Sequence, residues 1–189
     1  LTKSFQDGNF DAARLLVKML REGNRVPKNE TRAFEIVSQA AEKGNTQAQH
    51  FLGDLYESGA GVSKDLAKAR EAYMAAAEAG LAQSQNKLGL IYGDGQEGLE
   101  ADRAKSQEWF QKAAEQGNAN AQHNLAVMYR DGDGIAKDPD EAVKFFRNAA
   151  TQGNADAQYK LGDMYAKGLG VELDEVEAAK WFRKAAEAN

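Results

Sequence analysis

The sequence contains no cysteine, only two prolines and no long apolar run. Without cysteine the chain can form neither a disulfide nor a thiolate zinc site. So few prolines favour uninterrupted helices. No segment approaches the roughly 18 consecutive apolar residues that cross a bilayer. We therefore expect a helical chain without a membrane span.

An excess of positive charge is also absent. The formal net charge is −5 and the isoelectric point is about 5.2. This balance argues against binding to nucleic acids through their phosphates. The chain begins at Leu1 rather than Met, and we expect a processed or excised start from which an export signal has been removed. A periplasmic or secreted location fits that start, and a cytoplasmic one stays open.

What the sequence does contain is a repeat. A glycine that ends a run of small residues recurs in steps of 36, 36, 37 and 36 residues, at Gly8, Gly44, Gly80, Gly117 and Gly153. A fixed period of this length is typical of solenoids, whose units bury their apolar faces only against neighbours. The period predicts one continuous domain over residues 1–189. We place its units at 9–44, 45–80, 81–117, 118–153 and 154–189, with 1–8 a remnant or cap.

Each unit is predicted to be a helix–loop–helix. The first helix carries apolar residues at i, i+4 and i+8, which form one stripe for burial; an example is Ala157, Leu161 and Tyr165. A very small residue follows each stripe leucine, as Gly162 does here, and we expect a neighbouring helix backbone to approach it closely. The first helices are expected over 47–58, 83–92, 120–130 and 156–166.

The second helix is expected to begin after a capping residue. The predicted caps are Asn29, Asp65, Asp102, Asp138 and Asp174, whose side-chain oxygens can accept from free backbone amides. Glu141 and Glu177 stand three residues after their caps, which predicts capping boxes. Further along, paired large residues precede alanine pairs, and this tight pattern predicts core positions for Trp109-Phe110, Phe145-Phe146 and Trp181-Phe182.

The last unit makes a family resemblance clear. Residues 157–171 read AQYKLGDMYAKGLGV, and residues 181–186 read WFRKAA. This pattern resembles a Sel1-like repeat, a family related to the tetratricopeptide repeats. The resemblance implies an all-α fold, a right-handed α/α superhelix of about five repeats. It also implies that the first helices line the concave face.

No pattern in the sequence supports catalysis. The Gly-x-Gly pairs lack the preceding strand and third glycine of a dinucleotide site. His50 and His123 occupy equivalent positions two repeats apart, too far to share a metal ion. Most carboxylates stand at helix caps or on polar faces, and no nucleophile with its base stands out. We therefore expect no enzyme activity, no cofactor and no metal.

The outward side of the first helices remains as a candidate binding surface. It comprises the positions two before and two after each stripe leucine, and some positions one turn further on, which include Glu57. Because these positions mix basic, aromatic, aliphatic and amide groups, we expect them to bind a peptide or protein segment. The candidate residues are Arg14, Lys18, Arg21, His50, Asp54, Asn86, Leu90, His123, Val127, Arg130, Tyr159 and Asp163.

These observations leave three hypotheses. The leading one is a non-enzymatic scaffold or adaptor for protein interactions, monomeric, with end-to-end self-association left open. The second follows from the resemblance alone: Sel1-like proteins of bacteria include inhibitory partners, such as immunity proteins that neutralise secreted toxins. The third, which the resemblance alone also implies, is an enzyme of the cell envelope that acts on peptidoglycan-like material. The identity of the partner is not encoded in any motif of the sequence.

Overall fold

The computed structural model describes residues 10–23, 27–96 and 98–188, and of residues 10–14 and 16 it describes the backbone alone. Within these ranges there are ten α-helices of 13 residues each and no β-strand. The predicted all-α fold is confirmed. The predicted marker Gly8 and the segment 1–8 lie outside the described residues.

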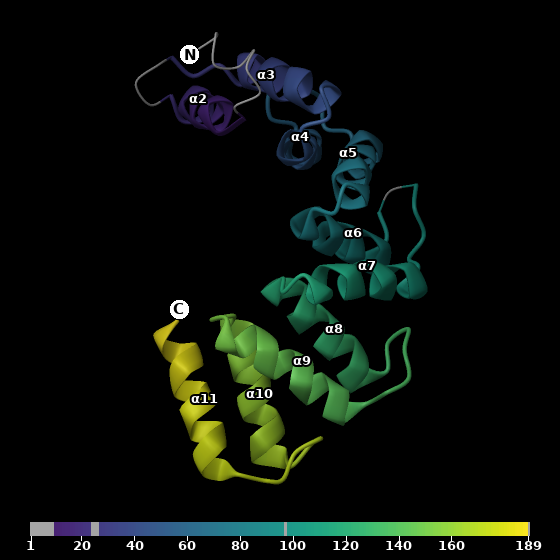
Figure 1. Ribbon diagram of the computed structural model, residues 1–189, viewed down its shortest axis with the longest axis vertical. Helices are drawn as coiled ribbons and strands as arrows, with labels where there is room; N and C mark the ends of the chain where they lie inside the picture. Colours follow the sequence, from purple (N-terminus) through teal and green to yellow (C-terminus); the bar gives the residue numbers. More distant parts are fainter. Residues whose placement is uncertain (1–9, 24–26, 97, 189) are drawn as a thin grey trace. The chain divides into compact units, whose positions relative to one another are not determined.

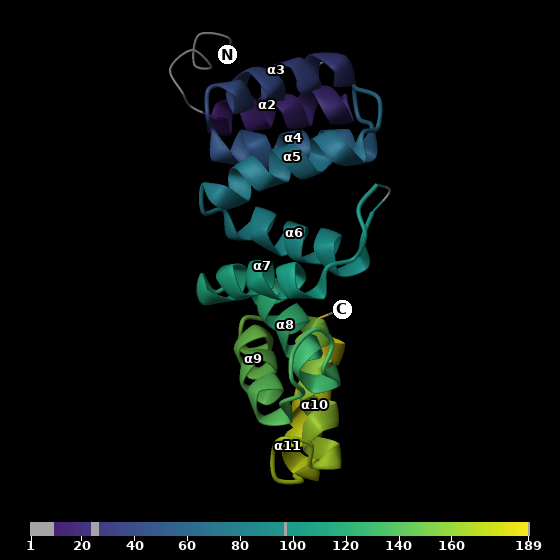
Figure 2. The ribbon, with the colours of Figure 1, turned by 90° about the vertical axis from the view of Figure 1, so that its right-hand side faces the viewer.

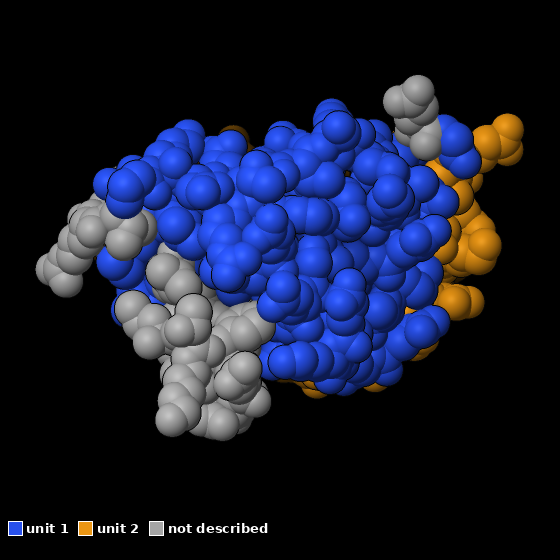
Figure 3. Space-filling view, turned by 90° about the horizontal axis from the view of Figure 1, so that it is seen from above, with its two compact units in different colours: residues 1–88, 96–98 blue, residues 89–95, 99–189 orange. Residues whose placement is uncertain are grey.

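By its internal contacts the chain divides into two compact units, coloured separately in Figure 3. Unit 1 comprises residues 1–88 and 96–98, and unit 2 comprises residues 89–95 and 99–189. Helix α6 (Ala82–Asp94) belongs to both units. The organisation of the whole chain as one continuous domain stays a prediction.

Unit 1 is a stack of helices in chain order, with neighbours side by side in both ribbon views (Figures 1 and 2). Its complete helices are α2 (Phe10–Glu22), α3 (Glu30–Glu42), α4 (Thr46–Ser58) and α5 (Leu66–Glu78). Their core gathers apolar residues of α2, α3 and α4, including Val17, Val37 and Leu55, which are fully buried.

Unit 2 repeats this arrangement. Its complete helices are α7 (Arg103–Glu115), α8 (Ala119–Asp131), α9 (Pro139–Thr151), α10 (Ala155–Lys167) and α11 (Glu175–Glu187). Each of these helices packs against the next one along the chain. Phe146, Leu161 and Met164 are almost completely buried in the core of this unit. The helix bounds agree with the predicted first helices to within two residues.

The predicted stripe is buried for most of its length. Ala121, Leu125, Ala157 and Leu161 have no exposed surface. The tyrosines that end the stripe are only half-buried, and so is Leu52. Of the paired aromatics, Phe110, Phe146 and Trp181 are buried, whereas their partners Trp109, Phe145 and Phe182 are half-buried. One residue of each pair therefore belongs to the core.

The small residue after the stripe leucine is close to an aromatic ring. The helix backbone that we expected comes close only at Gly162, where an added Cβ would lie 3.2 Å from the carbonyl oxygen of Ala178; at Gly53 and Gly89 the close atoms belong to the ring. A Cβ atom added at Gly53 would lie 2.5 Å from the ring of Tyr73. A Cβ added at Gly89 would lie equally close to the ring of Phe110. In both cases the ring comes from the second helix of the same repeat. Glycine is therefore needed here to seat an aromatic side chain.

The loop within each repeat is closed by its cap. All five predicted caps accept a hydrogen bond from the backbone amide three residues on, as Asp138 does from Glu141 at 3.0 Å. The capping boxes, however, are wrong. Glu141 binds Lys144, and the amide of Asp138 instead donates to the carbonyl of Tyr129 at 2.8 Å. The backbone amide that a capping box would pair is therefore already hydrogen-bonded to a carbonyl of the previous helix.

A short turn joins one repeat to the next. The marker glycines there are left-handed, with φ of 80° at Gly44 and 82° at Gly117, a conformation that glycine adopts without steric penalty. The asparagine after the glycine caps the following first helix: Asn45 accepts from the amide of Ala48, and Asn118 does the same at the next such turn in unit 2. We did not predict these caps, although the recurring Gly-Asn pair signals them.

Candidate functional site

The predicted binding residues fall into two groups, one in each unit. Lys18, Arg21, His50, Asp54 and Asn86 belong to unit 1. Leu90, His123, Val127, Arg130, Tyr159 and Asp163 belong to unit 2. The side chain of Arg14 lies outside the described residues.

The position two residues before the stripe leucine covers an aromatic ring of the second helix. The ring centroids of His50 and Tyr73 are 5.5 Å apart, and the same distance separates Tyr159 from Phe182. His123 packs on Phe146 in the same way. Each of these side chains therefore takes part in packing through the face that lies against the ring.

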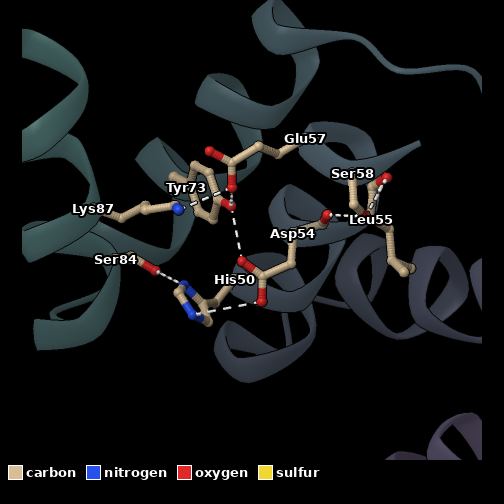
Figure 4. A network of polar contacts seen from close by, with 8 residues as sticks. All are labelled: His50, Asp54, Leu55, Glu57, Ser58, Tyr73, Ser84 and Lys87. Atoms are coloured by element: carbon tan, nitrogen blue, oxygen red, sulfur yellow. Dashed lines mark hydrogen bonds and ion pairs between the residues drawn. The ribbon is translucent and has the colours of Figure 1, made fainter. Parts of the chain in front are cut away.

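In unit 1 this position continues into a connected group of polar side chains (Figure 4). We define the polar cluster as His50, Asp54 and Glu57 of α4, Tyr73 of α5, and Ser84 and Lys87 of α6. The hydroxyl of Tyr73 lies 2.8 Å from Oδ1 of Asp54 and 2.9 Å from Oε2 of Glu57. The ammonium of Lys87 lies 2.9 Å from the same Oε2.

His50 extends the polar cluster toward α6. Its Nδ1 lies 2.8 Å from the hydroxyl of Ser84, and its Nε2 lies 3.9 Å from Oδ2 of Asp54. Burial lowers the pKa of His50, although the charge of Asp54 opposes that shift. The imidazole is therefore neutral at pH 7.

The polar cluster has a buried base and an accessible rim. Tyr73 and Ser84 have no exposed surface. The side chains of Asp54, Glu57 and Lys87 keep 39, 33 and 31% of theirs. Burial raises the pKa of Tyr73, and the two neighbouring carboxylates raise it further, so its hydroxyl keeps its proton. The rim can therefore contact a partner while the base holds it in place.

Tyr73, Ser84 and Lys87 were not among the residues predicted from the sequence. A comparison between repeats could have found two of them. Where this repeat has Tyr73, the later ones have Phe110, Phe146 and Phe182; where the third first-helix stripe begins with Ser84, the other stripes begin with Ala48, Ala121 and Ala157. Polar residues at positions that are apolar elsewhere were the available signal.

In unit 2 the candidate residues carry more apolar surface. Leu90 is 39% exposed and Tyr159 is 54% exposed, while Val127 packs against the core. Arg130 forms two hydrogen bonds to the adjacent Asp131, at 2.7 and 2.6 Å. Its pKa is raised, first of all by these bonds. Unit 2 thus presents exposed apolar side chains beside groups that are already paired.

Tyr159 also borders a shallow hollow of about 510 Å³ at the end of unit 2. The hollow is lined by Ala155, Asp156, Tyr159, Phe182, Ala185 and Ala186. The alanine pair Ala185-Ala186 in this lining differs in exposure from the equivalent pair of the preceding repeat. The equivalent alanines Ala149 and Ala150 are completely or almost completely buried, whereas Ala186 is exposed.

Other kinds of site find no support in the described residues. Among them no three His, Asp or Glu side chains are grouped so as to hold a metal ion. No helix there has the length and apolar character of a membrane span. The second glycine of the Gly-x-Gly pairs serves packing: a Cβ at Gly61 would collide with the backbone of Glu30, the first residue of α3.

Comparison with known proteins agrees with the repeat pattern. The Sel1 repeat profile matches residues 9–45, 46–81, 82–118, 119–154 and 155–189. A protective antigen of uropathogenic Escherichia coli with an SLR fold is 34% identical, with a TM-score of 0.88 over 96% of this chain and 39% of the antigen. The chain thus spans well under half of that protein.

Two further structures are similar. A Sel1 repeat protein of Oxalobacter formigenes is 33% identical, with a TM-score of 0.86 over 95% of this chain and 71% of that protein. An immunity protein of Pseudomonas aeruginosa is 23% identical, with a TM-score of 0.62 over 94% of this chain and 64% of that one. A search of the curated proteins gave no match.

The predicted fold class is confirmed as the solenoid of Sel1-repeat proteins, a family that typically serves as scaffolds for protein interactions and is generally non-enzymatic. The profile covers the chain from residue 9 to its last residue, and the helix pairs of both units coincide with it. The chain belongs to the Sel1 repeat family.

Proposed function

We propose that this chain is a protein-interaction module without catalytic activity, and that the outward positions of its first helices bind a segment of a protein partner. One observation carries the proposal. The repeats keep the same stripe pattern and the same caps of the second helices, while the outward pair changes from His and Asp to Asn and Leu, then to His and Val, and then to Tyr and Asp. Packing requires the stripe and the caps to be uniform. The outward positions are under no such requirement, so their side chains can be suited to a partner.

The exposed apolar side chains support a protein partner. Leu90 and Tyr159 occupy outward positions and are among the large apolar residues that stay exposed. Aromatic and aliphatic groups beside charged ones are the usual composition of a protein interface. An extended or helical segment is the simplest ligand for positions that repeat along successive helices.

Inhibition of a toxin is one form that such binding can take. The similar Pseudomonas aeruginosa structure is described as an immunity protein. At 23% identity this likeness concerns the fold alone. No described residue of the chain favours a toxin over another protein partner, so the proposal is kept at the level of protein binding.

The test compares two double variants of the immobilised full chain. Leu90→Ser with Tyr159→Ser removes apolar surface from the outward positions. Leu173→Ser with Val176→Ser is the matched control, since these residues are 58 and 69% exposed but lie outside the candidate surface. Proteins captured from an extract of the native host are identified by mass spectrometry.

We expect the control to retain the captured partner and the outward variant to lose at least about 90% of it, because exposed anchors of an interface contribute roughly 1–2 kcal/mol each. Circular dichroism and thermal unfolding should show that both variants remain folded. Equal capture by the two variants would contradict the proposed surface.

A further inference from the structure

We propose that the hollow at the end of unit 2 binds an α-helix of a partner protein, and that this helix carries the residues of a Sel1 first helix. Those residues are an asparagine cap, an Ala-Gln pair three residues later, and a leucine three residues after the glutamine. The hollow lies beside α11, which packs on α10 (Figure 1). This contact is additional to the proposed function, because only Tyr159 belongs to both surfaces.

The equivalent surface one repeat earlier is already covered by a helix. The residues that correspond to the lining of the hollow are Ala119, Asn120, His123, Phe146, Ala149 and Ala150. Helix α10 packs against α9 there, and Phe146, Ala149 and Ala150 are at most 1% exposed. In the last repeat Phe182 is only half-buried and Ala186 is exposed. The hollow therefore repeats an interface that a first helix fills in the fourth repeat.

Hydrogen bonds between repeats fix α10 on this inner interface. Nε2 of Gln158 donates to the carbonyl of Ala150 at 3.1 Å, and the same bond recurs in the two preceding repeats. Nδ2 of Asn154, the cap of α10, donates to Oδ1 of Asn120 at 2.9 Å. The interface thus recognises a helix by its glutamine and its capping asparagine as well as by its apolar side.

The hollow offers the same acceptors to an incoming helix. The carbonyl of Ala186 stands where that of Ala150 does, in the last turn of a second helix. Asp156 stands in place of Asn120, and its carboxylate can accept from the cap of the incoming helix. The negative charge of Asp156 also suits the partial positive charge at a helix N-terminus. A first-helix sequence therefore finds matching polar groups as well as matching shape.

The apolar part of the hollow is also that of an inner interface. Phe182 and Ala186 occupy the positions of an inner phenylalanine and alanine, although a solenoid end that faces water needs a polar outer face. Ala157 and Leu161 of α10 belong to the same buried cluster as Ala149. An alanine and a leucine of the partner helix would fill the hollow in the same way.

A second copy of this chain is the competing occupant, and its sequence fits less well. A copy would have to present α2, because the later first helices each already contact two second helices. In α2, Ala13 stands where the other first helices carry glutamine. Alanine has no side-chain donor for the carbonyl of Ala186. A helix of a different protein, with the glutamine present, is therefore the better occupant.

The experiment measures binding of a fluorescent helical peptide to the full chain by fluorescence polarisation. The peptide has the sequence of residues 154–167, from the asparagine cap to the end of α10. A hydrocarbon staple joins its positions 159 and 163, which are one turn apart on the outward side. The staple thus holds the helix without altering its asparagine, alanine, glutamine or leucine. A second peptide carries Gln158→Ala.

Two variants of the chain are compared with the wild type. Ala186→Arg places a long charged side chain in the hollow, and Ala104→Arg, on α7, is the matched control. Both alanines are exposed helical residues, so both variants are expected to fold, and circular dichroism verifies this. Tyr159 and Leu90 are unchanged in every form, so the proposed function is left intact.

We expect the wild type and the control to bind the first peptide saturably. Ala186→Arg should weaken binding by about tenfold or more, because it obstructs the hollow and repels the positive end of the helix. The Gln158→Ala peptide should bind the wild type about three- to tenfold more weakly, because it lacks one hydrogen bond, although alanine favours the helix.

The contrary results are distinct. No saturable binding to the wild type, or equal binding by Ala186→Arg, would overturn the proposed site. Equal binding of the two peptides would overturn the proposed recognition of glutamine. Sedimentation velocity of the chain alone should show no association through this end, and a dimer that Ala186→Arg abolishes would assign the hollow to a second copy. None of these results would contradict the proposed function of the outward positions.

Discussion

The Nδ1 atom of His50 lies 2.8 Å from the hydroxyl oxygen of Ser84, which stands 34 residues later. The same offset from His123 leads to Ala157, and Nδ1 of His123 is buried without a hydrogen-bond partner among the described residues. Two equivalent histidines in one chain thus differ in whether a serine is present to pair with them.

This difference predicts opposite effects of two exchanges. Ser84→Ala should lower the free energy of unfolding by about 1–2 kcal/mol, because it leaves a largely buried nitrogen unpaired. Ala157→Ser should raise it by about 0.5–1.5 kcal/mol, because it supplies the partner that His123 lacks. Urea unfolding of both variants measures these changes. A destabilising Ala157→Ser would show that the new hydroxyl does not reach the imidazole.

The histidines also predict how stability depends on pH. Burial lowers the pKa of both His50 and His123 below the ordinary value of 6.5. The unfolded chain therefore binds more protons than the folded one below that pH, and the stability contribution is present above it. As the pH falls from 6.5 toward the folded-state values, the free energy of unfolding should decrease.

The control for this pH dependence is built into the chain. Asn86 occupies the position equivalent to the two histidines, so His50→Asn combined with His123→Asn is compatible with the fold. Urea unfolding at about pH 7 and about pH 5.5, the window around the histidine pKa, should show a smaller loss in this variant than in the wild type. An equal loss would assign the effect to other groups.

Glycine at the aromatic contact is a third testable feature. Gly53→Ala should destabilise the chain by about 1–3 kcal/mol, because the new Cβ would lie 2.5 Å from the completely buried ring of Tyr73. Gly162→Ala should be milder, since the closest atom of the Phe182 ring is 2.9 Å away and Phe182 is only half-buried. Ala126 already occupies this position in the fourth repeat. Thermal unfolding of both variants should rank them in this order.

A fourth prediction concerns the caps of the second helices. Asp174→Ala should lower the free energy of unfolding by about 1 kcal/mol, because the carboxylate accepts from the amide of Glu177 at 2.9 Å. Glu177→Ala should change it little, because the side chain pairs with exposed Lys180 and serves no capping box. Urea unfolding distinguishes the two variants. A loss in Glu177→Ala as large as that in Asp174→Ala would indicate the capping box that the structure lacks.

The contrast between these features explains what the sequence could reveal. Caps such as Asp174 and stripe residues such as Leu161 act within one helix or one turn, and they recur with the period, so their roles can be deduced from spacing. The ring of Tyr73 against Gly53 requires the angle between two helices, which spacing does not contain. The polar cluster joins side chains from three helices and occurs in one repeat, so no periodic signal marks it.

The loops within the repeats lie outside the proposed binding surface. In the second repeat the amide of Asp65 reaches back to the carbonyl of Tyr56, and in the third the amide of Asp102 reaches Tyr92 at 2.7 Å although its loop is one residue longer. Both ends of the longer loop are tied to the same points, so the additional residue is absorbed between them. Residues inserted at this point should therefore leave the two helices that flank the loop unchanged. Longer loops can in this way add new contact surface to a repeat while its helices stay the same.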